Sequence, residues 1–140
     1  MSVYVIDASV AAKWFADEEH KQAARRALSG QHELHAPDFL LIEMDNVISK
    51  WLRGGLVDAP EADRIRRDLR ALPLKTYRFP PLLDSAYAIA RETGRSVYDS
   101  LYVALAVALD ERVATGDRRL YNALAGGRFV RYVLWVEDIE

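Results

Sequence analysis

The sequence feature that most constrains the fold is an apolar run near the start of the chain that ends in a carboxylate and then a hydroxyl. Residues 3–6 read Val-Tyr-Val-Ile, and Asp7, Ala8 and Ser9 follow directly. Four apolar residues without alternation are typical of a strand covered on both faces, as in the centre of a parallel sheet. Ligands of such sheets bind at the carboxyl ends of the strands, so Asp7 is expected at an active site.

Strand patterns and helical patterns alternate along the rest of the chain. Ser9 is expected to cap a short helix over 10–15, and apolar residues at three- and four-residue spacing over 40–52 predict a long helix that Gly54 ends. Further helices are expected near 23–28, 58–72, 81–93, 98–109 and 117–124, and further strands at 34–36, 74–79, 112–115 and 132–136. This order predicts one domain over residues 1–140, a three-layer α/β/α sandwich with a mostly parallel sheet of about five strands.

Composition excludes several classes of site. The chain has no cysteine, which removes disulfides, thiolate zinc sites and cysteine nucleophiles, and which suits a reducing cytoplasm. Asp7 and Lys13 interrupt any signal-peptide pattern, and no apolar stretch has the length of a membrane span, so we expect a cytoplasmic protein without a membrane partner. The formal net charge of −2 does not indicate a nucleic-acid binder, although a protein that grips phosphates through metal ions can show this balance.

Four acidic residues stand out by position. Asp7 and Asp117 follow expected strands, whereas Glu43 and Asp99 lie in the first turns of expected helices. Each has a structural explanation, since Asp7 or Asp117 could cap a helix, Asp99 fits a capping box with Ser96, and Glu43 could lie on a helix surface. Their joint placement at one edge of the sheet nevertheless predicts an enzyme site.

Four sequence blocks together resemble the PIN-domain family, and within it the VapC-type toxins of toxin–antitoxin modules. The blocks are Val-Ile-Asp-Ala-Ser at 5–9, Glu43 with Asn46, Tyr-Asp-Ser-Leu-Tyr-Val-Ala-Leu-Ala from residue 98, and Ala-Thr-Gly-Asp-Arg-Arg-Leu from residue 114. They occur in order between Val3 and about Val136. The resemblance implies a Mg²⁺- or Mn²⁺-dependent endoribonuclease, usually a homodimer, that a cognate antitoxin holds inactive.

The resemblance also implies roles for particular residues. The acidic quartet of the family corresponds to Asp7, Glu43, Asp99 and Asp117, and its polar support positions correspond to Ser9, Asn46 and Thr115. One departure from the family pattern is Asp45. Because it follows Glu43 by two residues, it should point about 200° around the helix and away from the site.

The chemistry of phosphodiester hydrolysis fits this set of residues. A divalent metal activates a water and compensates charge on the phosphoryl oxygens, and Mg²⁺ prefers oxygen ligands. We expect Asp7 and Asp99 as direct ligands, Asp117 as a ligand directly or through water, and Glu43 as the residue that orients the attacking water or acts as its base. The histidines at 20, 32 and 35 have no convincing zinc-ligand spacing.

Other residues carry weaker predictions. Lys13 and Arg118 are candidate phosphate contacts, although most such charges are solvated, and the arginines over 64–70 suit a solvent face or an antitoxin contact. The aromatic residues Trp14, Phe15 and Trp51 suit the core or an interface better than base stacking. Some apolar residues of two segments, Trp51-Leu52 and Leu134-Trp135-Val136, are expected at a homodimer contact, and core burial is the alternative for any of them.

Two alternative functions remain open from sequence. The fold could be a non-catalytic binding module that engages a protein or RNA, with its acids as caps and ion-pair partners. It could also be a phosphoryl-accepting receiver-like domain, but that class needs an acidic pair after its first strand, and Ala8 follows Asp7 here.

Overall fold

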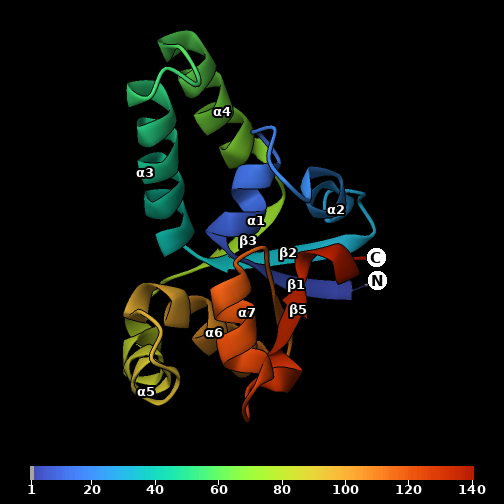
Figure 1. Ribbon diagram of the computed structural model, residues 1–140, viewed down its shortest axis with the longest axis vertical. Helices are drawn as coiled ribbons and strands as arrows, with labels where there is room; N and C mark the ends of the chain where they lie inside the picture. Colours follow the sequence, from blue (N-terminus) through green and yellow to red (C-terminus); the bar gives the residue numbers. More distant parts are fainter. Residues whose placement is uncertain (1) are drawn as a thin grey trace.

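Five parallel strands form the centre of the molecule. The computed structural model describes residues 2–140 (Figure 1). The strands are β1 (Ser2–Ile6), β2 (His32–Pro37), β3 (Leu74–Tyr77), β4 (Arg112–Thr115) and β5 (Val133–Trp135), in the order β3-β2-β1-β4-β5. Every pairing between neighbours is parallel. The predicted five-stranded parallel sheet is therefore confirmed.

Helices cover both faces of this sheet. They are α1 (Ala8–Lys13), α2 (Lys21–Arg26), α3 (Phe39–Arg53), α4 (Ala59–Ala71), α5 (Leu83–Thr93), α6 (Val97–Leu109) and α7 (Arg118–Ala125), with short 3₁₀ turns η1 (Pro80–Leu82), η2 (Val130–Tyr132) and η3 (Val136–Asp138). Helices α1 to α4 lie on one side of the sheet and α5 to α7 on the other (Figure 1). Within residues 2–140, none of the helices has the length and apolar character needed to cross a membrane. The three-layer α/β/α fold is confirmed.

Strand β1 lies in the middle of the sheet because its side chains are apolar on both faces. Tyr4, Val5 and Ile6 are almost completely buried, and β1 pairs with β2 on one side and with β4 on the other. The chain runs outward from β1 to β3 and then returns across the sheet to β4, so the strand order reverses between β1 and β4. Such a reversal opens a crevice at the carboxyl ends of the two strands, where ligands of α/β proteins bind.

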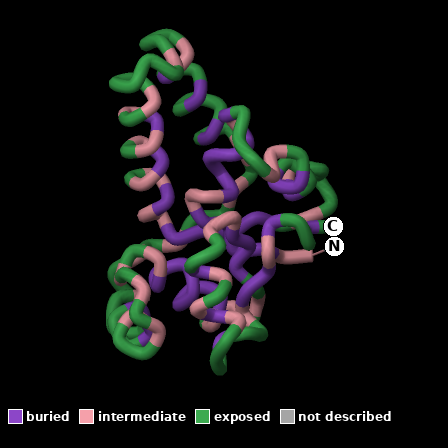
Figure 2. The backbone as a smooth tube through the Cα atoms, viewed as in Figure 1, coloured by how far each residue is buried: buried purple, intermediate pink, exposed green. Residues whose placement is uncertain are grey.

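Helices α3 and α4 form an arm that extends beyond the sheet (Figures 1 and 2). The arm has a small apolar cluster of its own, made by Ile48, Ala62 and Ile65. Asp45 joins the two helices, since Arg66 donates to both of its carboxylate oxygens at 2.8 and 3.0 Å. The expectation that Asp45 points away from Glu43 and the other acids is thus confirmed, and its role is to hold the arm together.

One local prediction was wrong, and another is narrowed. Asp7, and not Ser9, is the N-cap of α1, because the helix begins directly after β1 and the Asp7 side chain accepts a hydrogen bond from the Val10 amide. Of the residues considered for a homodimer contact, Leu134 in β5 and Val136 at the start of η3 are buried in the core. On the arm, by contrast, Leu52 is exposed.

Candidate active site

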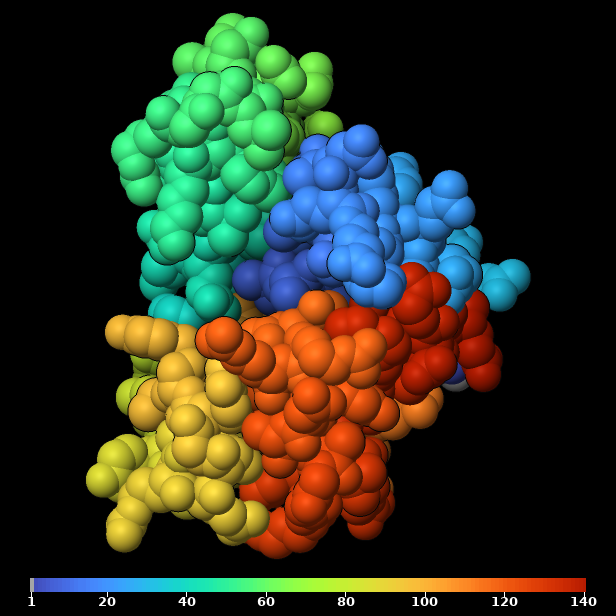
Figure 3. All heavy atoms as spheres, viewed as in Figure 1, coloured from blue at the N-terminus to red at the C-terminus, as the bar shows by residue number. Residues whose placement is uncertain are grey.

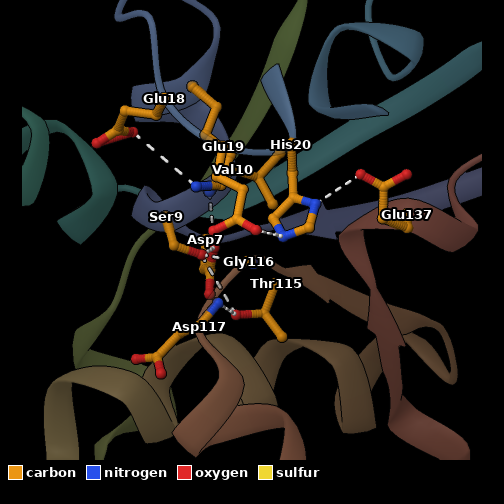
Figure 4. A network of polar contacts seen from close by, with 11 residues as sticks. Asp7, Ser9, Val10, Glu18, Glu19, His20, Thr115, Gly116, Asp117 and Glu137 are labelled. Carbon is orange, nitrogen blue, oxygen red and sulfur yellow. Dashed lines mark hydrogen bonds and ion pairs between the residues drawn. The ribbon is translucent and has the colours of Figure 1, made fainter. Parts of the chain in front are cut away.

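Four separate elements bring the predicted acids to the same edge of the sheet. Asp7 follows β1 and Asp117 follows the adjacent strand β4, while Glu43 lies on α3 and Asp99 in the first turn of α6. In Figure 3 the start of the chain, in dark blue, lies between the teal of α3 and the orange of α7. Figure 4 shows the Asp7 side of this region together with Asp117.

Asp7 is the most deeply buried of the acids, with only 5% of its surface exposed. Burial raises the pKa of its carboxyl from 3.8 to about 6, and the negative charge of Asp99 adds to this rise. Hydrogen bonds from the Ser9 hydroxyl at 2.6 Å and the Val10 amide at 3.1 Å act in the opposite direction. Because the pKa of Asp7 stays raised, these hydrogen bonds offset only part of the free-energy cost of burying its charge.

Ser9 and Thr115 connect the ends of the two central strands (Figure 4). The Ser9 hydroxyl donates to Asp7, accepts from the Gly116 amide at 2.8 Å and lies 3.3 Å from the Thr115 hydroxyl. Thr115 in turn accepts a hydrogen bond from the Asp117 amide at 3.0 Å. The structure therefore places both predicted support residues between the two strand-end acids.

Asp117 has a structural role as well as its place in the site. Its carboxylate accepts hydrogen bonds from the amides of Arg119 and Leu120, which makes it the N-cap of α7. Asp7 caps α1 in the same way. For these two acids the capping explanation is confirmed, and it is compatible with a place at the candidate site, because each helix starts where its strand ends.

Glu43 contacts a residue that the sequence analysis missed. Tyr102 on α6 donates a hydrogen bond to Glu43 Oε1 at 2.5 Å. Burial, followed by the charge of Asp99, raises the pKa of Glu43, whereas the Tyr102 hydrogen bond lowers it. The available sequence signal was the three-residue spacing between Asp99 and Tyr102, which puts both on one face of α6.

Asp99 is the electrostatic centre of the group. Burial and the charge of Asp117 raise its pKa, and Arg95, whose Nη2 atom lies 3.6 Å from Asp99 Oδ2, opposes this shift. Because Asp99 also raises the pKa of Asp7 and of Glu43, all four acids are coupled through it. Arg95 is a second residue that the sequence analysis did not assign.

The site fits a divalent cation in chemistry and in charge. The acids offer only oxygen ligands, as Mg²⁺ and Mn²⁺ prefer, and their mutual repulsion lacks a full counter-charge. Within the described residues 2–140, however, no three acidic or histidine side chains are gathered closely enough to form a ready-made metal cluster. Asp7, Asp99 and Asp117 are the residues that would hold the ion.

The predicted basic contacts have different environments. The Lys13 stem is buried against Gly116, where an added Cβ would lie 2.5 Å from Lys13 Cε, and its ammonium is 4.0 Å from the carboxylate of Glu18. This places the Lys13 charge beside the turn that carries Asp117. The guanidinium of Arg118 instead stacks 3.7 Å from the ring centroid of Trp135.

Asn46, the third predicted support residue, lies exposed on α3. It therefore differs from Ser9 and Thr115, which are directly hydrogen-bonded at the strand ends. Its position one turn after Glu43 keeps it on the same side of the helix. Its only link to the candidate site within the described residues is therefore that it shares α3 with Glu43.

Comparison with known proteins agrees with this geometry. The sequence matches the PIN domain family over residues 4–125. Ribonuclease VapC3 of Pyrobaculum aerophilum is 36% identical over 118 residues, 83% of this chain and 90% of that protein, and Ribonuclease VapC1 of Mycobacterium tuberculosis is 32% identical over 127 residues, 88% and 92%. The crystal structure of PAE2754 from Pyrobaculum aerophilum superposes with a TM-score of 0.69 at 26% identity, covering 97% of this chain and 85% of that one.

The chain therefore belongs to the PIN-domain family. Within that family, its similarity is to the VapC ribonucleases.

Proposed function

We propose that this protein is an endoribonuclease that hydrolyses RNA phosphodiester bonds with the help of Mg²⁺ or Mn²⁺, and that it is the toxin of a toxin–antitoxin pair. The observation that carries the proposal is the coupling of four carboxyls from four elements, three of which have raised pKa values. The names of the two VapC relatives supply the substrate class, RNA.

The side chains suit this reaction as follows. Asp7, Asp99 and Asp117 bind the cation, while Ser9 and Thr115 fix the turns that carry two of these acids. When bound, the ion supplies Lewis-acid compensation of phosphoryl charge and acidifies a water. Glu43 orients the attacking water and accepts its proton, a task for which a pKa raised toward neutrality is suitable.

The RNA backbone needs positive charge beside these acids. Lys13 is the better placed of the two predicted contacts, because its ammonium lies at the β4–α7 turn and its ion pair with Glu18 is long at 4.0 Å. A phosphate can displace such a weak partner. Arg118 can contribute from its stacked position on Trp135, since stacking leaves the charge of a guanidinium intact.

The partners belong to the same proposal. A cognate antitoxin would silence the enzyme in the cytoplasm, where its RNA substrate is also met. For a homodimer, the exposed Leu52 on the arm is a better candidate than the buried Leu134 and Val136. Light scattering at high micromolar concentration tests the oligomer, and a monomer there would contradict it.

The decisive experiment is cleavage of RNA by the purified, antitoxin-free protein. We expect cleavage with Mg²⁺ or Mn²⁺ and none in excess EDTA, because the ligands are all oxygen. Asp99→Asn protein purified in the same way controls for contaminating nucleases. Cleavage by the wild type that persists in EDTA, with the variant preparation inactive, would overturn the metal-dependent mechanism.

A non-catalytic binding module is the second candidate. It is favoured by the helix caps of Asp7 and Asp117 and by the lack of a ready-made three-ligand metal cluster within residues 2–140. This module would bind RNA or protein without cutting RNA under any metal condition. The cleavage assay combined with an RNA-binding assay separates the two candidates.

A further inference from the structure

We propose that Tyr102 is a positioning residue of this site, which holds the Glu43 carboxylate in the orientation that the reaction requires. The inference rests on the proposed function, because it assumes that Glu43 orients the attacking water and assigns Tyr102 the task of holding Glu43 in place. It concerns a side chain that lies within an apolar helix and that sequence patterns assign to the core.

The geometry of the pair supports this role. The Tyr102 ring is fixed in the core, with 1% of the residue exposed, and its hydroxyl donates to Glu43 Oε1 at 2.5 Å. The two residues are 59 positions apart and come from helices on opposite faces of the sheet. Within residues 2–140, this is the one side-chain hydrogen bond that Glu43 makes. Tyr102 is therefore the tether between Glu43 and the rest of the site.

A tether matters because a glutamate side chain is flexible. Fixing such a side chain costs conformational entropy. A base must also lie within hydrogen-bond reach of its proton, and misplacement by 1 Å can reduce the rate by about 10²-fold. Because packing fixes the Tyr102 phenol, its hydrogen bond orients the Glu43 carboxylate before substrate binds. The entropy of fixing Glu43 is then not lost during the reaction.

The protonation state of Tyr102 suits a permanent donor. Burial, followed by the charge of Glu43, raises the pKa of the phenol well above 10, and the charges of Asp7 and Asp99 act in the same direction. The hydroxyl therefore keeps its proton at any pH at which the enzyme works. The phenol thus responds electrostatically to three of the four acids and is in direct contact with Glu43.

A purely structural role is the competing explanation, since buried tyrosines usually find a hydrogen-bond partner. Tyr77 offers a matched control within this chain. Its hydroxyl also bonds a titratable group, His35 Nδ1 at 2.7 Å, but the pair lies on β2 and β3, and within residues 2–140 neither side chain is hydrogen-bonded to any of the four acids. Tyr77→Phe thus removes the same atom from a comparable hydrogen bond while every hydrogen bond of the four acids is kept.

The test is steady-state cleavage of a fluorescent RNA by Tyr102→Phe, by Tyr77→Phe and by wild type with Mn²⁺. We expect kcat of Tyr102→Phe to fall by between about 10-fold and 10²-fold, with KM within about twofold, because positioning of Glu43 is lost and RNA contacts are not. Tyr77→Phe should retain the wild-type kcat. In a Glu43→Gln background, adding Tyr102→Phe should cause no further loss.

Three outcomes would overturn the proposal: an unchanged kcat in Tyr102→Phe, equal losses in both tyrosine variants, or full additivity with Glu43→Gln. Crystal structures of wild type and Tyr102→Phe provide a readout that does not need activity. Release of the Glu43 carboxylate from its wild-type orientation supports the tether, and an unmoved carboxylate refutes it. If wild type fails to cleave RNA, the proposed function fails while these structures still decide the role of Tyr102.

Discussion

Glu43 and Asp45 are two residues apart on α3, yet their surroundings differ in every respect that sets the charge of a carboxyl. Asp45 faces α4, is partly exposed, and has its pKa lowered mainly by its hydrogen bond with Arg66, with Arg70 adding attraction. Glu43 faces the sheet edge, and burial together with Asp99 raises its pKa. The neighbours of Asp45 are cations, whereas the charged neighbour of Glu43 is another acid.

This difference separates an acid that serves the fold from an acid that serves a site. The Asp45 pair holds the arm together, and the attraction of Arg66 outweighs the desolvation of Asp45. At the sheet edge, by contrast, burial raises the pKa of Asp7, Glu43 and Asp99, and a neighbouring acid adds to each shift: Asp99 for Asp7 and Glu43, and Asp117 for Asp99. Perturbed carboxyls without a counter-charge are typical of functional sites, since a folded protein gains nothing from the repulsion.

The largest effect is expected from Asp99→Asn, which removes the charge through which the acids are coupled. Cleavage should fall by at least about 10²-fold, because a ligand is lost. The melting temperature in EDTA should stay equal or rise, since the pKa values of Asp7 and Glu43 fall when the Asp99 charge is gone. The stabilisation by millimolar Mg²⁺ should shrink.

Melting curves of wild type and Asp99→Asn, recorded in EDTA and in Mg²⁺, check this prediction. A variant that melts several degrees lower in both conditions and still cleaves RNA would show that Asp99 serves only the helix start.

An intermediate effect is expected on the pH dependence of metal-free stability. Between pH about 4 and about 6, folded protein keeps a proton on Asp7 that the unfolded chain has released, so the free energy of unfolding falls as pH rises. A pKa change from 3.8 to about 6 corresponds to roughly 3 kcal/mol. Asp7→Asn should lack this decrease, and asparagine can still cap α1.

Urea unfolding in EDTA from pH 4 to 7 measures this difference. If the stability of wild type relative to Asp7→Asn does not decline over that range, Asp7 does not carry a buried charge.

The smallest effect is expected from Asp45→Asn. Cleavage should match the wild type, and the melting temperature should decrease slightly, since exposed ion pairs contribute little. The folded pKa of Asp45 is lowered, so its contribution is present above its ordinary pKa of 3.8 and is lost as pH falls through the folded value. Melting temperatures of wild type and Asp45→Asn at pH 7 and pH 3 check this contribution. A loss of cleavage in Asp45→Asn would show that Asp45 is not separate from the site that contains Glu43.

Sequence patterns were sufficient for most of the fold. The run at residues 3–6 predicted β1 because a doubly covered strand must be apolar on both faces, and the apolar spacing over 40–52 predicted α3. The strand β5 was also predicted, over 132–136, but the sequence could not decide whether its apolar residues lie in the core or at an interface. Leu134 and Val136 lie near the end of the sequence, but their burial depends on pairing of β5 with β4, a contact between distant residues.

The candidate site was predictable where chemistry follows local structure. The positions of Asp7 and Asp117 follow from strands that end in acids, and Ser9 and Thr115 lie beside them. Tyr102 was missed because an aromatic residue in an apolar helix is ordinarily core, and its hydroxyl acquires meaning only when α3 and α6 come together. Arg95 was missed as well. It precedes α6, and its ion pair with Asp99 depends on where that helix begins.

The central position of β1 also has a consequence for the order in which the site can form during translation. The ribosome makes β1 before its partner β4, and both β4 and Asp117 come more than 100 residues after β1. Because domains fold as units, a nascent chain that ends before Asp117 has a strand of the site and no complete site. The strand order therefore means that the four acids can come together only after synthesis has passed Asp117.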